Sequence, residues 1–377
     1  MDNNPRELYI GLMSGTSMDG IDSAIVELEQ NHIKLIATYC HPIPKHLQQA
    51  IKSLFLPGDD NIDALGSADK QLGESFAQSV VTLLEKAGLK ASDITAIGSH
   101  GQTVRHRPPN TDTPHPFTLQ IGDPNIISAR TGITTVADFR RKDMAVGGQG
   151  APLAPAFHQA AFHSNKQNRV IVNIGGISNL TFLPSDGEVI GFDTGPGNRL
   201  LDDWIKQQQN KAFDDGGQWA SQYDSDEQLL KQLKTHPFLQ RSIPKSTGRE
   251  EFNKNWLDQQ LKRVGRLSPG CVQATLLAFT AETIADAINT LPVGIDEVFI
   301  CGGGALNTTL MASLGHLLQS VNIYSTATLG LAPEWVEAAA FAWLAKQTLA
   351  GLAGNLPPVT GAEKLTILGG IYPGFLS

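Results

Sequence analysis

The sequence has little cysteine and no excess of positive charge. Its 377 residues include only Cys40, Cys271 and Cys301, which are too few and too far apart for a disulfide framework or a zinc site. The formal net charge is -8, so bulk charge gives no reason to expect a nucleic acid or an anionic membrane as a partner. We therefore expect a protein of a reducing compartment with neither partner.

Long apolar runs are also missing. No stretch approaches the ~20 residues that span a bilayer. The N-terminus, MDNNPRELYIG, has no basic segment followed by an apolar one, so we expect no signal peptide. Hydrophobic residues nevertheless make up 41% of the chain, enough for a sizeable core, and the length suggests about two domains. The sequence predicts a cytoplasmic, two-domain globular protein.

Two strand–turn–strand segments organise the chain. The first spans residues 8–28 around GLMSGTSMDG, and the second spans 169–183 around NIGGISN. Each is followed by a helical pattern and a further strand, at 74–89 and 94–98 and at 279–291 and 297–304. We interpret this recurrence as a diverged duplication. The alternation predicts the α/β class, and the hairpins predict mixed rather than parallel sheets.

A segment rich in glycine and proline separates the two halves. It reads ADFRRKDMAVGGQGAPLAPAFH, residues 137–158, and is typical of an irregular hinge. We predict an N-terminal domain of residues 1–137 plus about 361–377 and a C-terminal domain of 138–360. The chain would end in a strand that returns to the first domain.

The first glycine turn partly matches a phosphate-binding loop. Gly15 and Gly20 have the P-loop glycine spacing, but Ile21 and Asp22 stand where that signature has Lys and Ser or Thr. A tight turn can still point backbone N–H groups into one concavity that binds an anion. Asp19 and Asp22 carry carboxylates that suit Mg²⁺. An ordinary hairpin turn is the alternative interpretation.

Two further glycine loops favour the phosphate interpretation. NIGGISN repeats the chemistry of the first turn, and CGGGALN follows a strand and opens a helix, where backbone can approach a nucleoside or phosphate closely. Together the three loops predict a site for ATP. The nucleotide-binding residues that we predict are Gly15, Thr16, Ser17, Met18, Asp19, Gly20, Ile21, Asp22, Asn173, Gly175, Gly176, Ser178, Asn179, Gly302, Gly303, Gly304 and Asn307.

Eight motifs resemble those of the anhydro-N-acetylmuramic acid kinase family, in the superfamily of acetate and sugar kinases, Hsp70 and actin. They are GLMSGTSMDG, AIGSHGQTVRH, ADFRRKD, GGQGAPLAPAFH, NIGGISN, GFDTGPGN, PKSTGREEFN and CGGGALN. The resemblance runs from Gly11 to beyond Glu337. It implies an actin-like ATPase fold: two duplicated ribonuclease H-like domains with mixed sheets flanked by helices and an ATP cleft between them.

The resemblance also implies the activity. ATP and water would convert 1,6-anhydro-N-acetylmuramic acid, an amino sugar from peptidoglycan recycling, to N-acetylmuramic acid 6-phosphate. Water would open the 1,6-anhydro ring, and the freed O6 would receive the phosphoryl group. Mg²⁺ as cofactor and a homodimer are implied in the same way.

Two carboxylates are candidates for catalysis. Asp193 ends the strand pattern EVIGFD beside a glycine loop, where it can polarise a water as general base; alternatively it only caps the next helix, a role open to Asn198 too. Glu337 lies on the apolar stripe of a helix, which requires a partner or a polar cleft. It either assists in orienting the water or sugar, as the resemblance suggests, or is a glutamate favoured by the helix dipole.

Basic and polar residues are candidates for binding the sugar. Arg140 and Arg141 belong to a basic cluster in the hinge, and an arginine fork suits the lactyl carboxylate of the expected substrate. Surface solvation or salt bridges are the alternative for this cluster. His100, Gln102 and Thr103 can hydrogen-bond sugar hydroxyls or the acetamido group, although a lone His is as often structural.

Two other functions compete with this one. A nucleotide-switched binding ATPase of the Hsp70 or actin type would use the same ATP loops without a small substrate. A plain sugar kinase would phosphorylate an existing hydroxyl. No peptide-binding domain follows the ATP motifs, and only the family resemblance separates the two kinase activities.

Overall fold

The computed structural model describes residues 7–15, 18, 20–29, 32–55, 61–109, 113–248 and 251–375. The chain divides into two compact units, Met1–Ala161 with Trp335–Ser377 and Phe162–Glu334. This division differs from the expected boundaries, because the hinge and helix α11 (Val336–Leu349) pack within the first unit. Asp143 of the hinge, for example, accepts hydrogen bonds from Asn355 and Thr360.

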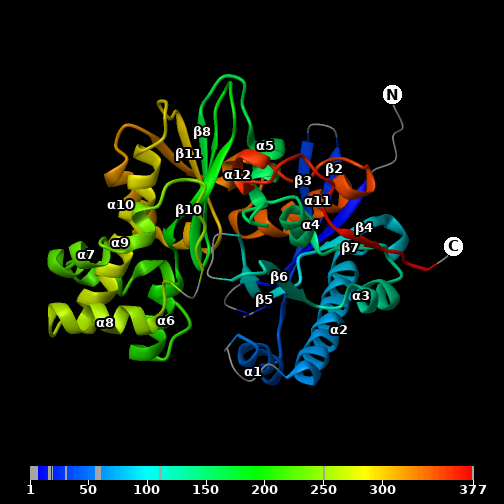
Figure 1. Ribbon diagram of the computed structural model, residues 1–377, viewed down its shortest axis with the longest axis horizontal. Helices are drawn as coiled ribbons and strands as arrows, with labels where there is room; N and C mark the ends of the chain where they lie inside the picture. The colour runs from blue at the N-terminus through cyan, green and yellow to red at the C-terminus, as the bar shows by residue number, and fades with distance from the viewer. Residues whose placement is uncertain are drawn as a thin grey trace. The chain divides into compact units, whose positions relative to one another are not determined.

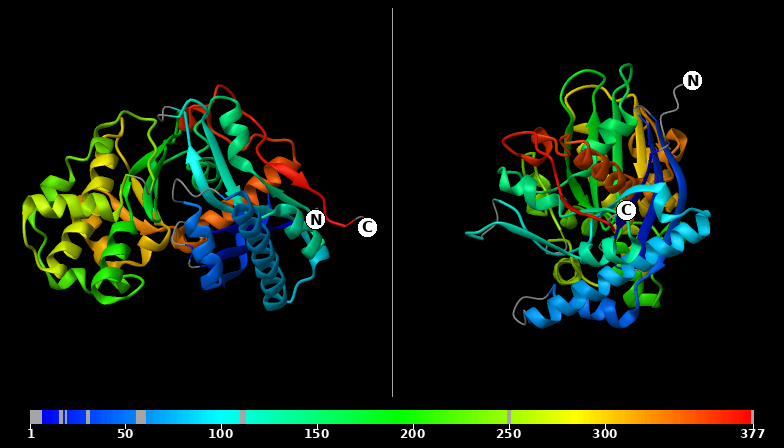
Figure 2. Two further views of the ribbon diagram at one scale, coloured as in Figure 1. Left: turned by 60° about the horizontal axis from the view of Figure 1, so that its bottom comes forward. Right: turned by 90° about the vertical axis from the view of Figure 1, so that its right-hand side faces the viewer.

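The first unit is built on a six-stranded sheet of order β13-β7-β4-β1-β2-β3. β1, β2 and β3 are antiparallel neighbours, β4 and β7 continue parallel to β1, and β13 pairs antiparallel with β7. The C-terminal strand, red in Figure 2, therefore returns to this sheet as the sequence predicted. The strands are β1 (Leu8–Met13), β2 (Gly20–Glu29), β3 (His32–Pro42), β4 (Ile94–Ser99), β7 (Thr135–Ala137) and β13 (Gly370–Tyr372).

The second unit repeats the same five-strand core. Its sheet has the order β10-β9-β8-β11-β12, with an antiparallel β8–β9–β10 meander and β11 and β12 parallel to β8. Two copies of this order and these directions confirm the predicted duplication of ribonuclease H-like domains and the actin-like ATPase fold. The strands are β8 (Arg169–Ile174), β9 (Ile177–Leu183), β10 (Ile190–Pro196), β11 (Glu297–Cys301) and β12 (Asn322–Ser325).

Helices cover both faces of the first sheet. The long helix α2 (Ile62–Ala87) begins at Asn61, whose side chain accepts the Asp63 N–H at 2.8 Å, and ends at Gly88 in the left-handed conformation. Its apolar side packs with β1 residues such as Ile10. The remaining elements of this unit are α1 (Lys45–Ser53), β5 (Gln102–Arg107), β6 (Phe117–Ile121), α3 (Pro124–Thr131), α4 (Phe139–Ala145), α5 (Ala154–Phe162) and α12 (Pro357–Thr360).

Helix α11 covers the other face of the first sheet at unusually short range. A Cβ at Gly11 of β1 would meet the Ala338 carbonyl, and one at Gly98 of β4 would meet the Phe341 carbonyl. Side chains alternate between the two faces of a strand, so Gly11 faces α11 while Ile10 faces α2. Two glycines and an alanine-rich helix therefore let two backbones touch.

The helices of the second unit gather on one face of its sheet (Figure 1). One of them, α9, is long and apolar enough to cross a membrane by length and composition, but 72% of its most apolar window is buried, so it serves as a core helix. The helices are α6 (Arg199–Gln209), α7 (Glu227–Leu233), α8 (Lys254–Val264), α9 (Pro269–Asn289) and α10 (Thr308–Leu317).

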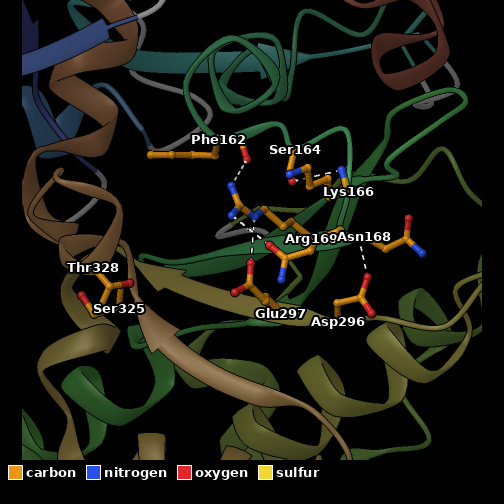
Figure 3. Close-up of polar contacts among 10 residues, drawn as sticks. Phe162, Ser164, Lys166, Asn168, Arg169, Asp296, Glu297, Ser325 and Thr328 are labelled. Atoms are coloured by element: carbon orange, nitrogen blue, oxygen red, sulfur yellow. Dashed lines mark hydrogen bonds and ion pairs between the residues drawn. The ribbon is translucent and has the colours of Figure 1, made fainter.

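The start of β8 is anchored on the opposite face. Arg169 forms an ion pair with Glu297 at 2.9 Å and donates to the Phe162 carbonyl at 2.9 Å, as Figure 3 shows. The neighbouring Asn168 N–H donates to Asp296 Oδ2 at 2.7 Å. These bonds hold β8 and β11 together at the ends of the strands far from the glycine loops.

The close approach of α11 gives a stability test. We expect Gly98→Ala to lower the free energy of unfolding by about 1–3 kcal/mol, because the added methyl group collides with a helix carbonyl. Gly66→Ala in α2 is the matched control: nothing lies within 4 Å of that Cβ. It should stabilise the protein by ~0.5–1 kcal/mol. Denaturant unfolding measures both, and a Gly98→Ala protein as stable as the control would contradict this packing.

Candidate active site

The turn between β8 and β9 is fastened through two successive carbonyl groups. Asn198 holds both: its backbone N–H donates to Gly175 O at 2.8 Å, and its side-chain Nδ2 donates to Ile174 O at 3.2 Å. The Gly176 carbonyl accepts from the N–H groups of residues 197 and 199, at 3.0 and 3.2 Å. The segment DTGPGN thus fixes the orientation of the second glycine turn.

These bonds also decide where the N–H groups of the turn point. In a trans peptide the N–H is directed opposite to the carbonyl. Since the carbonyls of Ile174 and Gly175 point toward Asn198, the N–H groups of Gly175 and Gly176 point away from it. Neither N–H group has a backbone acceptor in the described part of the chain. Two such donors on one side of a turn form a concavity that suits a phosphate.

The third glycine loop packs directly on this turn. Gly302 has a φ of 77°, and a Cβ there would meet the Asn173 side-chain oxygen. A Cβ at Gly304 would meet the Ile174 side chain. The structure therefore brings Asn173 and the 302–304 loop together within one unit. Asn307 caps α10, because its Oδ1 accepts the Leu310 N–H at 3.0 Å.

Asp193 lies within β10, not at the start of a helix. Its backbone N–H donates to Lys245 O at 3.0 Å, and its Oδ2 accepts the Thr247 N–H at 2.8 Å. The pairing of β10 with β9 shifts between Asp193 and Gly195, and such a bulge re-aims side chains. Helix α6 begins later, at Arg199, so the alternative that Asp193 only caps this helix is wrong.

A half-buried lysine lies beside this carboxylate. The Lys245 Nζ donates to Leu239 O at 3.1 Å and lies 4.9 Å from the centre of the Phe238 ring. Burial lowers the pKa of Lys245, and the charge of Asp193 partly opposes that shift. The KSTG segment, residues 245–248, thus supports Asp193.

The first hairpin is described only in part. Thr16, Ser17 and Asp19 lie outside the described residues. Met18 and Ile21 are fully buried in the first core, so their side chains serve packing. Asp22 is partly buried on β2. No group of three or more potential metal ligands occurs among the described residues.

The buried His100 and the partly buried Arg140 form a pair in the first unit. Arg140 donates from Nε and Nη2 to His100 Nε2 at 3.1 and 3.0 Å, and from Nη1 to Gly150 O at 2.8 Å. Arginine only donates, so His100 Nε2 is the acceptor and Nδ1 carries the proton that binds Gly101 O at 2.9 Å. Burial, and then the Arg140 charge, hold the pKa of His100 well below its usual range.

The other predicted sugar ligands also have partners inside the unit. Gln102 Oε1 accepts the Ser14 hydroxyl at 2.7 Å, which joins the 100–103 loop to the first hairpin. Thr103 Oγ1 accepts from Gln120 at 3.1 Å. Arg141 is exposed and forms an ion pair with Asp138 at 2.7 Å. Of the two arginines, Arg140 is the one that the fold holds rigidly.

Asp143 fastens the hinge beneath Arg140. Its Oδ2 accepts the Gly150 N–H at 2.8 Å, and its Oδ1 accepts from Asn355 and Thr360, each at 2.9 Å. Gly150 in turn accepts the Arg140 side chain. The sequence did not point to Asp143 or Thr247, and it offered Asn198 only as a helix cap, because the roles of these residues come from contacts between distant segments. Glu337 lies in the first turn of α11, half-buried.

Comparisons with known proteins agree with the family resemblance of the eight sequence motifs. The family model described as anhydro-N-acetylmuramic acid kinase matches residues 7–374. A relative of that name from Shewanella woodyi (strain ATCC 51908 / MS32) is 52% identical over 369 residues, 98% of this chain and 99% of the relative. One from Coxiella burnetii (strain Dugway 5J108-111) is 52% identical over 372 residues, 98% of each chain.

Solved structures are similar at much lower identity. Component A of the (R)-2-hydroxyglutaryl-CoA dehydratase of Acidaminococcus fermentans has a TM-score of 0.47 at 13% identity, over 89% of this chain and 96% of that one. A ROK family glucokinase from Streptomyces griseus, in complex with glucose and AMPPNP, has a TM-score of 0.40 at 12% identity, over 90% and 99%. The fold assignment rests on the strand order of the two sheets.

The buried His100 predicts how stability depends on pH. Unfolded histidine gains a proton below about pH 6.5, whereas folded His100 does not, so its contribution to stability is lost as pH falls, by ~1.4 kcal/mol per pH unit. From about pH 7.5 to about pH 5.5, His100→Gln should therefore lose less stability than the wild type, by ~1.4 kcal/mol. Exposed His32→Gln should follow the wild type. Equal losses in all three proteins, measured by denaturant unfolding, would refute a neutral His100.

Proposed function

The chain belongs to the anhydro-N-acetylmuramic acid kinase family, and from this premise we propose which residues carry out the reaction. The activity is that of the family: an ATP-using kinase opens the 1,6-anhydro ring of 1,6-anhydro-N-acetylmuramic acid with water and phosphorylates O6. Family membership excludes the nucleotide-switched binding ATPase that the sequence left open. The assignments to individual residues below are proposals.

The second glycine turn is proposed to bind ATP phosphates. The observation that carries this proposal is the grip of Asn198 on the carbonyls of Ile174 and Gly175, which leaves the N–H groups of Gly175 and Gly176 as donors. Backbone donors that are fixed before binding stabilise phosphoryl transfer without a lysine. The 302–304 loop, packed against Asn173, takes the nucleoside side.

The first glycine turn is proposed as the second contact with the ATP phosphates and as the place where Mg²⁺ binds. Gly15 and Gly20 flank it, and Asp22 with Asp19 would hold Mg²⁺ through water, as Mg²⁺ prefers. Mg²⁺ would neutralise charge on the transferred phosphoryl group. Asp19, like Thr16 and Ser17, lies outside the described residues, so this proposal rests on the sequence motif.

Asp193 is proposed as the general base. A base must keep one orientation to take a proton from water, and the Thr247 N–H fixes Asp193 Oδ2 at 2.8 Å. The acceptor of the Asp193 N–H, Lys245 O, and the donor to its carboxylate, Thr247 N–H, both belong to the KSTG segment. Glu337 is proposed to assist in orienting the water or the sugar, as the family resemblance implies.

Arg140 is proposed to bind the lactyl carboxylate of the substrate. His100 and Gly150 hold its guanidinium from two sides, and a bidentate carboxylate contact needs such a fixed fork. His100, Gln102 and Thr103 are proposed to position the site: His100 holds Arg140, Gln102 binds Ser14, and Thr103 accepts from Gln120. Arg141 is proposed as an outer contact. A homodimer and a cytoplasmic location complete the proposal, on the resemblance alone.

A labelling experiment tests the reaction and its base together. With Mg·ATP and the anhydro sugar in ¹⁸O-water, the wild type should place the label on the anomeric carbon of the 6-phosphorylated product. Asp193→Asn should abolish turnover while nucleotide affinity stays within about twofold, since a general base contributes ~10²–10⁴-fold or more to the rate. Near-normal turnover in this variant would remove Asp193 from the role. An unlabelled phosphosugar from the wild type would mean direct transfer to an existing hydroxyl.

A further inference from the structure

The loop that follows strand β11, residues 302–307, is fixed at its first end by neighbouring segments; we call it the nucleoside loop. The Gly302 N–H donates to Pro333 O at 2.9 Å, and a Cβ at Gly304 would collide with the Ile174 side chain. Glycines lose more conformational freedom on ordering than other residues, so a loop with three in succession needs support at both ends to keep one shape. The other end of the nucleoside loop leads directly into helix α10.

A second segment holds that other end. It is the turn Asp215–Gly217, which we call the DGG turn. The hydroxyl groups of Thr308 and Thr309, the first two residues of α10, both donate to Gly216 O, each at 3.0 Å. The Thr309 hydroxyl also lies 3.2 Å from Gly217 O, so it is shared between two successive carbonyl groups. The DGG turn is thus hydrogen-bonded to the chain at the point where the nucleoside loop ends.

The two glycines of the DGG turn make this close approach possible. Gly216 and Gly217 have φ angles of 60° and 73°, in the left-handed region where a side chain is strained. A Cβ at Gly217 would also lie 2.4 Å from Asn307 Oδ1 and 2.6 Å from Thr309 Cβ. Asn307 Oδ1 in turn accepts the Leu310 N–H at 3.0 Å. The DGG turn therefore packs directly on the side chain that ends the nucleoside loop and caps α10.

A buried carboxylate fixes the DGG turn to the core of the second unit. Asp214 is only 9% exposed, and its two side-chain oxygens accept the Trp219 N–H at 2.8 Å and the Ala220 N–H at 2.9 Å. Gln273 of α9, which is fully buried, also donates to Asp214 Oδ2 at 3.3 Å. The Gly217 N–H donates to Asp214 O at 3.0 Å. Because α9 is a core helix, these bonds give the DGG turn a fixed position.

We propose that the DGG turn positions the nucleoside loop and so sets the affinity of the enzyme for its nucleotide. The inference rests on the proposed role of the 302–304 loop in binding the nucleoside. A loop that is ordered before binding loses less conformational entropy when the ligand arrives, so a support raises affinity without touching the ligand. The proposed base and the sugar ligands lie on other segments. The DGG turn therefore acts on nucleotide binding and leaves the chemical step and the sugar unchanged.

The double variant Thr308→Val with Thr309→Val tests this proposal, since valine keeps the shape of threonine and removes the hydroxyl. We expect the Kd for ADP, measured by titration calorimetry, and the KM for ATP to rise about 10-fold. The values of kcat and of the KM for the sugar should stay within about twofold of the wild type. The matched double variant Thr308→Ser with Thr309→Ser keeps both hydroxyl groups and should bind ADP as the wild type does.

Two results would overturn the proposal. One is an unchanged Kd for ADP in the double valine variant. The other is a rise in the KM for the sugar, or a fall in kcat, as large as the loss of nucleotide affinity, because that pattern reports general damage to the fold.

Glycine variants separate this proposal from the one on which it rests. Gly217→Ala should raise the Kd for ADP ~10-fold or more, because the added methyl group collides with Asn307. Gly315→Ala, on the same helix α10 with nothing within 4 Å of its Cβ, is the matched control and should not change this Kd. Gly302→Ala alters the nucleoside loop itself. If only Gly302→Ala weakens ADP binding, the role of the DGG turn is wrong; if Gly302→Ala binds ADP normally, the nucleoside assignment is wrong as well.

Discussion

The grip of Asn198 on the second glycine turn is the interaction on which the rest of the site depends. One residue donates from its backbone and its side chain to two successive carbonyls. Peptide geometry then forces two N–H groups to the opposite side. Helix α9 supports the grip, because the Thr280 hydroxyl donates to Gly197 O at 3.0 Å. The proposed phosphate site thus lies at a turn that carries no charged side chain.

Each unit holds its candidate site residues in one orientation through hydrogen bonds from neighbouring segments. In the second unit, backbone groups of the KSTG and DTGPGN segments and the side chain of Asn198 fix Asp193 and the glycine turn. In the first unit, the Asp143 carboxylate fixes the backbone of Gly150, and the Gly150 carbonyl and a neutral His100 fix Arg140. In each case a reactive or charged group is held by residues far away in sequence, before any substrate binds.

Much of the fold was predictable, because strand and helix patterns are local. The two hairpins, the strand at 94–98 and the return of the C-terminal strand appear as expected, whereas the strand predicted at 297–304 ends at Cys301, where the glycine loop begins. The roles of Asn198 and His100 were not predictable from pattern alone. Asn198 stands where a helix cap is expected, yet its side chain bonds to a strand 24 positions earlier. Such contacts depend on tertiary packing, which periodicity does not report.

Amide hydrogen exchange can test whether the N–H groups of Gly175 and Gly176 donate to a bound phosphate. On saturation with a non-hydrolysable ATP analogue, we expect strongly slowed exchange at both glycines. Helix α8, distant from the loops in sequence, serves as the internal reference and should not change. Unchanged exchange at Gly175 and Gly176 in the nucleotide-saturated protein would contradict the account.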